Sequence, residues 1–409
     1  MKTLLIAFVI LTPCCIFGQG VWFNDSLPAF GMSDAQSEVI NGKIYVITWG
    51  IASIDNQGLA TLDSALLSIF DPVQHTWTNP AQAVPFKGGF VTCSVSGKIY
   101  IIGAESDSLT NNMEVFDPAS NTWSNISYSG IFTPRILLTA SAVNGKIYAI
   151  GGFHHDKDLN IVEVFDPSSN SWTSPQISGS STARDSHTAC VLGGKIYIVG
   201  GENQYFIDKL EVFDPATNSW STPTTSGTFT PRGGLTSSAL DGKIYAIGGY
   251  NFAPKTNVLE VFDTATNTWT TPQTSGTFTA RTGLTSSVVG NRIYTIGGIE
   301  FINSQNLTIF FPGNYNEVFS PLASEVKSEQ SPELSLYPNP TTGIVSIQGA
   351  PSNDLNISVL NLLGETVMEQ KNLQSLPDLT LDLSKLVPGT YYIRFSSANS
   401  MVTKKIIKN

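Results

Sequence analysis

A tyrosine-centred cassette recurs six times along this 409-residue chain at nearly constant spacing. The string NGKIYAIGGF around Tyr148 is one clear copy. The six tyrosines are Tyr45, Tyr100, Tyr148, Tyr197, Tyr245 and Tyr294, separated by 55, 48, 49, 48 and 49 residues. A period of this length indicates supersecondary units that cannot bury their apolar faces alone and therefore stack on one another. The repeat thus constrains the fold more than any single residue does.

The clearest cassettes carry signals for four short strands. In the copy around Tyr148, an apolar stretch precedes Asn144-Gly145, a pair typical of two-residue hairpin turns. The residues after that turn predict a second strand, and residues 161–166 predict a third. A tight turn of Asp, Pro, Ser and Asn then leads to Trp172, which begins the fourth. Four antiparallel strands in about 49 residues, repeated radially, describe one blade of a β-propeller.

These linked motifs resemble the kelch family. The resemblance is carried by an arginine before the first strand, G-K-I-Y-x-I-G-G in the second, E-V-F-D-P in the third and N-x-W in the fourth. The first repeat departs from the pattern, because Ile47-Thr48-Trp49 replaces the glycine pair. The resemblance implies an all-β fold, a six-bladed kelch-type β-propeller over residues 20–320.

The last repeat lacks a tryptophan strand, whereas an unmatched tryptophan precedes the first repeat. Trp22 lies ten residues before Met32, just as Trp77 lies ten residues before Lys87, the next position of the repeat arginine. We therefore expect residues 20–27 to supply the fourth strand of the sixth blade. This N-terminal strand would close the ring and remove two unpaired strand edges, which otherwise favour aggregation.

The beginning of the chain resembles a secretory signal peptide over residues 1–19. It has Lys2, a short apolar run and small residues near Gly18. The run is too short to span a bilayer, and no other segment qualifies as a transmembrane segment. Cys93 and Cys190 occupy equivalent positions in repeats two apart, so we expect buried free thiols rather than a disulfide.

The periodicity stops after Phe319. Residues 321–335 are polar and predict a linker, and residues 336–409 predict a small β-sandwich. This segment resembles the C-terminal sorting domain of the type IX secretion system of some Gram-negative bacteria. The motifs that carry the resemblance are Tyr337-Pro338-Asn339-Pro340, Gly343, Leu362-Leu363-Gly364, Leu386, Pro388-Gly389, Tyr391-Tyr392 and Lys404-Lys405. The resemblance implies export through the periplasm and outer membrane, with the type IX secretion machinery as a partner.

Basic residues precede the first strand in five repeats, on the face expected to carry the loops between second and third strands. They are Lys87, Arg135, Arg184, Arg232 and Arg281. Such a ring could capture a carboxylate or an acidic partner. The alternative is structural: each pairs with a third-strand glutamate and holds a loop in place. Those glutamates are Glu114, Glu163, Glu211, Glu260 and Glu317. We favour this alternative because a site is usually asymmetric, whereas these residues recur.

The connections between second and third strands are the asymmetric part of the repeat. The longest are residues 50–66 and 299–316, in blades that would be neighbours in a closed ring. The second connection contains the aromatic residues Phe301, Phe310, Phe311 and Tyr315. If exposed, such residues suit recognition of a protein or a glycan. The alternative is that they pack the loops against the scaffold.

A histidine cluster is the feature that most resembles a catalytic or metal site. His154 and His155 lie in the third repeat, and His187 enters the fourth beside Asp185. Adjacent blades could bring them together as metal ligands or as an acid and base. No spacing matches a known metal motif, and polar loop residues would explain the cluster equally.

We interpret the chain as a secreted or cell-surface recognition module, with binding on the face that carries the arginines. The alternative is a carbohydrate-active enzyme on a sugar acid, mutarotase- or oxidase-like, with one arginine holding the carboxylate. A purely structural surface component is a third possibility. We expect a monomer with no cofactor and no metal, and a protein or glycan as the ligand. The net charge of −10 disfavours nucleic acid.

Overall fold

The computed structural model describes most of the chain after residue 19. The described ranges are 20–28, 32–54, 60–80, 84, 89–104, 113–251, 257–304, 307–312, 314–321, 335–348, 355–361, 366–373, 379–397 and 400–409. The predicted signal peptide therefore lies outside them. The described residues form strands and no α-helix, and no helix long and apolar enough to cross a bilayer is found among them. The chain divides into two compact units, with the boundary between residues 322 and 323.

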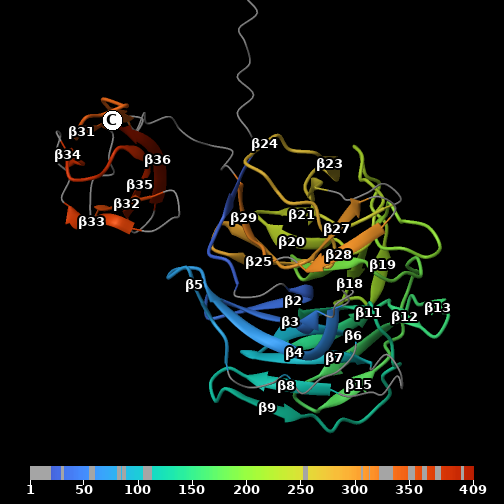
Figure 1. Cartoon of the computed structure of the whole chain (residues 1–409). Helices are drawn as coiled ribbons and strands as arrows, with labels where there is room; N and C mark the ends of the chain where they lie inside the picture. The colour runs from blue at the N-terminus through green and yellow to red at the C-terminus, as the bar shows by residue number, and fades with distance from the viewer. Residues whose placement is uncertain are drawn as a thin grey trace, which may run out of the picture. The chain divides into compact units, whose positions relative to one another are not determined.

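The described part of the first unit contains six larger sheets with the predicted antiparallel pairing, and the sixth of them adds one short parallel strand (Figure 1). Sheet one has β2 (Ser33–Ile40), β3 (Lys43–Ile54), β4 (Ala60–Asp71) and β5 (Thr76–Thr78); sheet two has β6 (Gly89–Val95), β7 (Lys98–Ala104), β8 (Met113–Asp117) and β9 (Thr122–Asn125). Sheet three has β10 (Thr139–Val143), β11 (Lys146–Ile150), β14 (Val162–Asp166) and β15 (Ser171–Thr173). Sheet four has β16 (Thr188–Leu192), β17 (Lys195–Val199), β18 (Leu210–Asp214) and β19 (Ser219–Ser221); sheet five has β20 (Thr236–Leu240), β21 (Lys243–Ile247), β22 (Leu259–Asp263) and β23 (Thr268–Thr270). Each of these sheets is a meander in chain order, as the repeat predicts.

Sheet six combines both ends of the repeat region. Its order is β24-β1-β29-β26-β25, from β24 (Thr274–Ser275), β1 (Gly20–Asn24), β29 (Asn316–Pro321), β26 (Arg292–Ile296) and β25 (Thr285–Val289). β1 pairs antiparallel with β29, so that Trp22 lies opposite Phe319. The fourth strand of this sheet is therefore supplied from the N-terminal side, over residues 20–24 of the predicted 20–27.

The hairpin turns follow from the turn residues. Between β10 and β11, Asn144 has a φ of 50° and Gly145 a φ of 76°. Two successive positive φ angles match the twist of antiparallel strands, and Asn and Gly adopt them at low cost. The register that results places Tyr148 opposite Ser141 and Val164, at the centre of its sheet.

Neighbouring sheets contact one another through their first strands. Ser37 Oγ on β2 lies 2.7 Å from Thr285 Oγ1 on β25, which joins sheets one and six. Thr188 Oγ1 on β16 lies 2.9 Å from Ser237 Oγ on β20. Apolar clusters also lie between adjacent sheets, and one of them joins Met32 of the first repeat to residues of sheet six. A phenylalanine recurs in the third strand of each sheet, and each of these side chains is at most 1% exposed. They are Phe70, Phe116, Phe165, Phe213, Phe262 and Phe319.

The two longest connections are largely β-hairpins rather than irregular loops. β3 and β4 continue their pairing as far as Ile54 and Ala60. β27 (Ile299–Ser304) and β28 (Leu307–Pro312) form a separate two-stranded sheet. A much smaller hairpin between β11 and β14 joins β12 (Phe153–His154) to β13 (Lys157–Asp158) as a two-stranded sheet of its own.

The two cysteines of the repeat region are free and buried, as predicted. Cys93 lies opposite Tyr100, and Cys190 lies opposite Tyr197 in the equivalent pair of strands. Burial raises the pKa of Cys93 well above its usual value and that of Cys190 to about 12. Both thiols are therefore protonated and unreactive at neutral pH.

The second unit is a two-sheet β structure. One sheet contains β30 (Ser335–Tyr337), β31 (Ile344–Gln348) and β34 (Leu379–Asp382); the other contains β33 (Thr366–Leu373), β32 (Leu355–Leu360), β35 (Gly389–Ser397) and β36 (Ser400–Lys408). Val345 and Leu381 from the first sheet share a buried cluster with Val359 and Ile393 from the second. The unit therefore has a core of its own.

Candidate functional site

The four arginines of the repeat lie inside the protein, and none exposes more than 2% of its surface. Each forms an ion pair within its own sheet: Arg135 with Glu163, Arg184 with Glu211, Arg232 with Glu260 and Arg281 with Glu317. Each guanidinium also donates to the carbonyl oxygen of the first glycine of the Gly-Gly pair. The arginine therefore joins the loop before the first strand to the second and third strands.

The glutamates are bound by the same loops. Besides Arg232, Glu260 accepts hydrogen bonds from the backbone N–H of Thr230 at 2.9 Å and from its hydroxyl at 2.8 Å. Burial lowers the pKa of Arg232, and the Glu260 carboxylate opposes that effect. Such a buried pair is stable only while both partners are present. Because these donors are used inside the protein, the geometry favours the structural alternative over capture of a ligand carboxylate.

The first sheet lacks both members of the pair. Met32 stands in place of the arginine and Ser68 in place of the glutamate, and both are fully buried. The joint replacement avoids an unpaired buried charge, which is costly. Lys87 lies outside the described residues, so its role stays a prediction. Its expected partner, Glu114, is 6% exposed, and burial raises the pKa of this carboxyl.

The predicted aromatic patch lies only partly within the described residues. Phe301, Phe310 and Phe311 belong to the strands of the β27–β28 hairpin, where Phe301 pairs with Phe310, but their side chains lie outside the description. Tyr315 is half-buried, and its ring centroid lies 4.8 Å from the Arg281 guanidinium carbon. Tyr315 thus packs against the scaffold, while recognition by the three phenylalanines stays a prediction.

The three histidines differ in environment. His154 and His155 lie at the β12–β13 hairpin with ring centroids 4.3 Å apart, and His155 is exposed. His187 is buried, and its Nε2 lies 3.1 Å from Thr139 Oγ1. Burial and the Arg184 charge lower the pKa of His187 to about 3, so it is neutral at ordinary pH. Within the described ranges, no group of three or more His, Cys, Asp and Glu side chains could hold a metal ion.

Asp185 belongs to an acidic cluster that also contains residues the sequence analysis did not name. Its backbone pairs with Glu202, and the Tyr250 hydroxyl from sheet five donates to the Glu202 carboxylate. Burial, together with Asp158 and Glu202, raises the pKa of Asp185 to about 7. Sequence reasoning missed Glu202 and Tyr250, which follow the Gly-Gly pairs of sheets four and five. Their exposure could not be judged without the fold.

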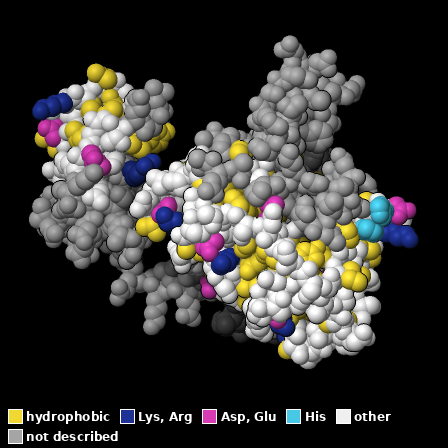
Figure 2. All heavy atoms as spheres, turned by 90° about the horizontal axis from the view of Figure 1, so that it is seen from below, with side chains coloured by type: hydrophobic (Ala, Val, Ile, Leu, Met, Phe, Trp, Pro, Cys, Tyr) yellow, Lys and Arg dark blue, Asp and Glu magenta, His cyan; other side chains and the backbone are white. Residues whose placement is uncertain are grey.

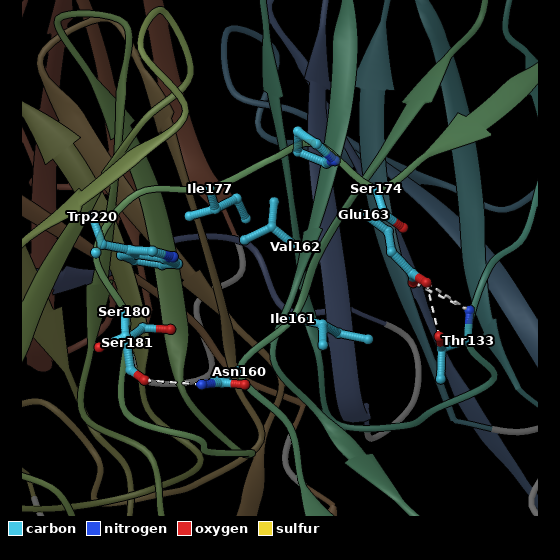
Figure 3. Close-up of a pocket in the computed structure, with 12 residues that line it drawn as sticks. Thr133, Asn160, Ile161, Val162, Glu163, Ser174, Ile177, Ser180, Ser181 and Trp220 are labelled. Carbon is cyan, nitrogen blue, oxygen red and sulfur yellow. Dashed lines mark hydrogen bonds between the residues drawn. The ribbon is translucent and has the colours of Figure 1, made fainter.

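A groove of about 370 Å³ opens between sheets three and four (Figure 3). It is lined by Thr133, Asn160, Ile161, Val162, Glu163, Ser174, Pro175, Ile177, Gly179, Ser180, Ser181 and Trp220. Figure 3 shows the Trp220 indole directed across the groove toward Val162. We call this recess the Trp220 groove. Its walls combine aliphatic side chains with neutral polar groups and the Glu163 carboxylate, which is paired with Arg135.

The loop before sheet four follows the same backbone path as its counterparts in sheets three and five. Trp220 N donates to Ser178 O at 2.9 Å, as Trp172 N does to Ser129 O and Trp269 N to Ser226 O. The next residue is always a glycine with positive φ, held against the tryptophan carbonyl, at Gly130, Gly179, Gly227 and Gly276. A Cβ atom there would lie within 3.0 Å of that carbonyl oxygen, so each of the four loops needs a glycine at this point.

This common path assigns equivalent positions three residues before each arginine. Phe132 lies there in sheet three, Phe229 in sheet five and Phe278 in sheet six. Their ring centroids lie 4.6, 4.7 and 4.7 Å from Trp172, Trp269 and Trp22, respectively. In sheet two, Val84 fills the equivalent position and is buried. In sheet four the residue is Ser181, which leaves Trp220 without an aromatic cover.

The loss of the cover is visible in the exposure of the tryptophans. Trp220 is 9% exposed, whereas Trp22, Trp172 and Trp269 are 3 to 4% exposed. This groove was not among the sites predicted from the sequence. The signal was present, because S-G-x-F-T-x-R occurs three times and S-G-S-S-T-A-R once.

Figure 2 shows charged side chains scattered singly over one face of the described residues, with no extended patch of either sign. The described residues of that face therefore carry no clustered basic charge of the kind that nucleic-acid binding needs. The Trp220 groove is a departure from the repeat that is described with its side chains.

Comparison with protein-family models gives three matches. Residues 137–318 match the KLHDC2/KLHL20/DRC7 Kelch-repeats domain, and residues 87–128 match the Kelch motif. Residues 335–409 match the Secretion system C-terminal sorting domain. No curated protein matches the chain. Both predicted resemblances are confirmed, and the sorting domain directs the chain to the cell surface or exterior through the type IX system.

Proposed function

We propose that this kelch-repeat protein, exported through its type IX sorting domain, is a recognition module that binds an extracellular ligand in the Trp220 groove. The observation that carries the proposal is the replacement of the covering phenylalanine by Ser181 in one sheet. Sites are usually asymmetric features on a regular scaffold. The groove is such a departure, and it leaves the Trp220 indole more exposed than its counterparts in sheets three, five and six.

The size and chemistry of the groove suit binding rather than catalysis. A volume of about 370 Å³ falls within the ordinary range for small-ligand sites. Ile161, Val162 and Ile177 supply apolar wall, and no group suited to proton transfer faces it unpaired, because Glu163 is held by Arg135 and Thr133. The burial of an apolar group against the indole would supply the binding free energy.

The alternative of an enzyme on a sugar acid is not supported by the arginines. That function requires one repeat arginine to hold the substrate carboxylate, whereas all four of the repeat arginines are paired with glutamates. Displacing Glu260 from Arg232, for example, would leave a buried charge without a partner. We therefore propose no reaction for this protein.

A pair of single substitutions tests the proposal. Ser181→Phe restores the phenylalanine of the other repeats and should close the groove without disturbing the fold. Ile131→Phe is the matched control, because Ile131 is 79% exposed in the equivalent loop of sheet three. The full chain and both variants would be applied to glycan arrays and arrays of extracellular proteins. We expect Ser181→Phe alone to lose ligand; a ligand held equally by all three proteins would refute the site.

A further inference from the structure

We infer that the Trp220 groove receives an aromatic side chain from a partner polypeptide, in the way that three other sheets receive one from their own chain. The inference rests on the proposed function for the position of the site and adds the chemical class of the occupant. It follows from what fills the same position elsewhere in the molecule.

The occupied sheets define the geometry of the expected contact. The phenylalanine and tryptophan rings are tilted by 35° in sheet three, 38° in sheet five and 32° in sheet six. Tilted rings at centroid distances of 4.6 to 4.7 Å are a favourable arrangement for two aromatic groups. Trp220 lies on the same strand, after the same loop path, so it presents its indole for the same contact.

The arginine beneath the groove supports an aromatic occupant. In sheets three, five and six the guanidinium carbon lies 4.6 to 4.7 Å from the centroid of the covering phenylalanine. Arg184 has no aromatic ring over it among the described residues. Arg184 also lies turned in its site, because Nη1 rather than Nε donates to the glycine carbonyl oxygen, at 2.7 Å. A cavity of only about 10 Å³ beside the groove is lined by both Arg184 and Trp220. A ring in the groove would therefore contact the indole, and it would reach the guanidinium only where this small cavity widens to admit it.

The polar groups of the groove favour an aromatic side chain over a sugar. Asn160 Nδ2 donates to Ser181 O at 3.3 Å, as the dashed line in Figure 3 shows. Glu163 is bound by Thr133 and Arg135. A sugar ring carries several hydroxyl groups, each of which loses free energy on burial unless it finds a partner. Because these two polar side chains are already engaged, an apolar ring loses less on entering.

The backbone around the groove indicates how the partner presents its ring. Ser178 already pairs with Ser219 beside Trp220, as Ser129 does with Ser171. The position of the loop backbone is therefore occupied by the chain itself, and only the side-chain position is open. A partner would reach it with an aromatic residue at a protruding turn or a chain end, rather than with an added strand.

The test uses a peptide copied from the chain. The capped peptide Ser-Gly-Thr-Phe-Thr-Pro repeats residues 226–231, which cover Trp269 in sheet five. The same peptide with alanine in place of phenylalanine is its control, and chitotriose is the sugar probe. The readout is the indole N–H signal of Trp220 in the ¹H–¹⁵N spectrum of the full chain, assigned with a Trp220→Phe variant.

We expect the phenylalanine peptide to shift this signal saturably and the alanine peptide to bind at least tenfold more weakly. Ser181→Phe should abolish the response, and Ile131→Phe should retain it. A response to chitotriose without one to the peptide would overturn the inference and leave the proposed binding site standing. If neither probe shifts the signal, the aromatic occupant is refuted. The array experiment with Ser181→Phe then decides separately whether the groove is a site at all.

Discussion

Trp22 lies opposite Phe319 in the antiparallel pairing of β1 and β29, with their ring centroids 5.0 Å apart. The two residues are nearly 300 positions apart in the chain, yet they form the same contact that Phe165 and Trp172 form within sheet three. Trp22 also contacts Phe278, at 4.7 Å between centroids. One sheet of the propeller therefore depends on a strand from the opposite end of the repeat region.

Deletion of residues 20–27 should destabilise the whole propeller, because it removes the strand beside β29 and exposes its edge. The single substitution Trp22→Ala should cost about 3–5 kcal/mol in the free energy of unfolding through loss of the buried ring. Thermal unfolding followed by circular dichroism measures both. An unfolding temperature unchanged by the deletion would show that β1 does not hold the ring.

Ser181→Phe should stabilise the protein. The new ring would cover Trp220 on a backbone that already follows the path of the phenylalanine-containing loops. Burying most of a phenylalanine against an existing wall contributes about 1–2 kcal/mol, which corresponds to a rise of about 2–4 °C in unfolding temperature. Scanning calorimetry of the variant and wild type measures the shift. A lower unfolding temperature would mean that the groove cannot accept the ring.

The converse substitution, Phe132→Ser, should open a second groove over Trp172. It removes the ring that lies 4.6 Å from that indole and 4.7 Å from the Arg135 guanidinium carbon. The expected cost is about 3–5 kcal/mol, the usual range for truncating a buried aromatic side chain. Denaturant titration gives the free energy of unfolding. A loss of less than about 1 kcal/mol in the free energy of unfolding would show that the contact between Phe132 and Trp172 contributes little to stability.

Breaking one buried ion pair should cost more than removing both partners. Arg232→Met alone leaves the Glu260 carboxylate buried without its counter-charge, at a cost of about 3–5 kcal/mol. The double variant Arg232→Met with Glu260→Met should recover much of that loss. A double-mutant cycle from unfolding free energies checks this. Additive losses would argue against coupling between the two side chains.

Asp185→Asn should alter the pH dependence of stability. The pKa of Asp185 is about 7 in the folded protein against a reference of 3.8. Between these values the folded protein holds a proton that the unfolded chain has released, so wild-type stability falls as pH rises from about 4 to about 7. The asparagine side chain does not titrate, so the variant does not lose this stability. Its free energy of unfolding at pH 8 should exceed that of wild type by on the order of 2 kcal/mol.

Unfolding temperatures of Asp185→Asn and wild type at several pH values between 4 and 8 measure this effect. The exposed Asp156 provides the control substitution, Asp156→Asn. The difference between variant and wild type should grow through the window and level off above it. A difference that does not vary with pH would rule out a raised pKa at Asp185.

Much of the fold could be predicted because its signals are local. The Asn144-Gly145 turn adopts the two positive φ angles that its residues favour, and β11 and β14 fall within the predicted strands. The pairing of Trp22 with Phe319 was also predictable, since the position of an unmatched tryptophan can be counted along a regular repeat. The connections at 50–66 and 299–316 were less predictable, and much of each is paired strand.

The candidate site was not predictable in the same way. The recurring residues Arg135 and Arg232 were candidates for binding a ligand, but both are buried in ion pairs with glutamates. The Trp220 groove arises instead from one missing side chain at Ser181. The absence of a phenylalanine side chain leaves a recess only if neighbouring side chains do not fill the space.

The sequence by itself determined the repeat, the strands within it, their turns and the sorting domain, because hydrogen-bonding pattern and turn preference depend on residues close together in the chain. Only the tertiary structure decided which charged residues are buried and which tryptophan is the more exposed one. Those properties depend on side chains from two sheets that pack against each other, such as Val162 of sheet three and Trp220 of sheet four. Their distance in space is set by the packing of the sheets and not by the repeat itself.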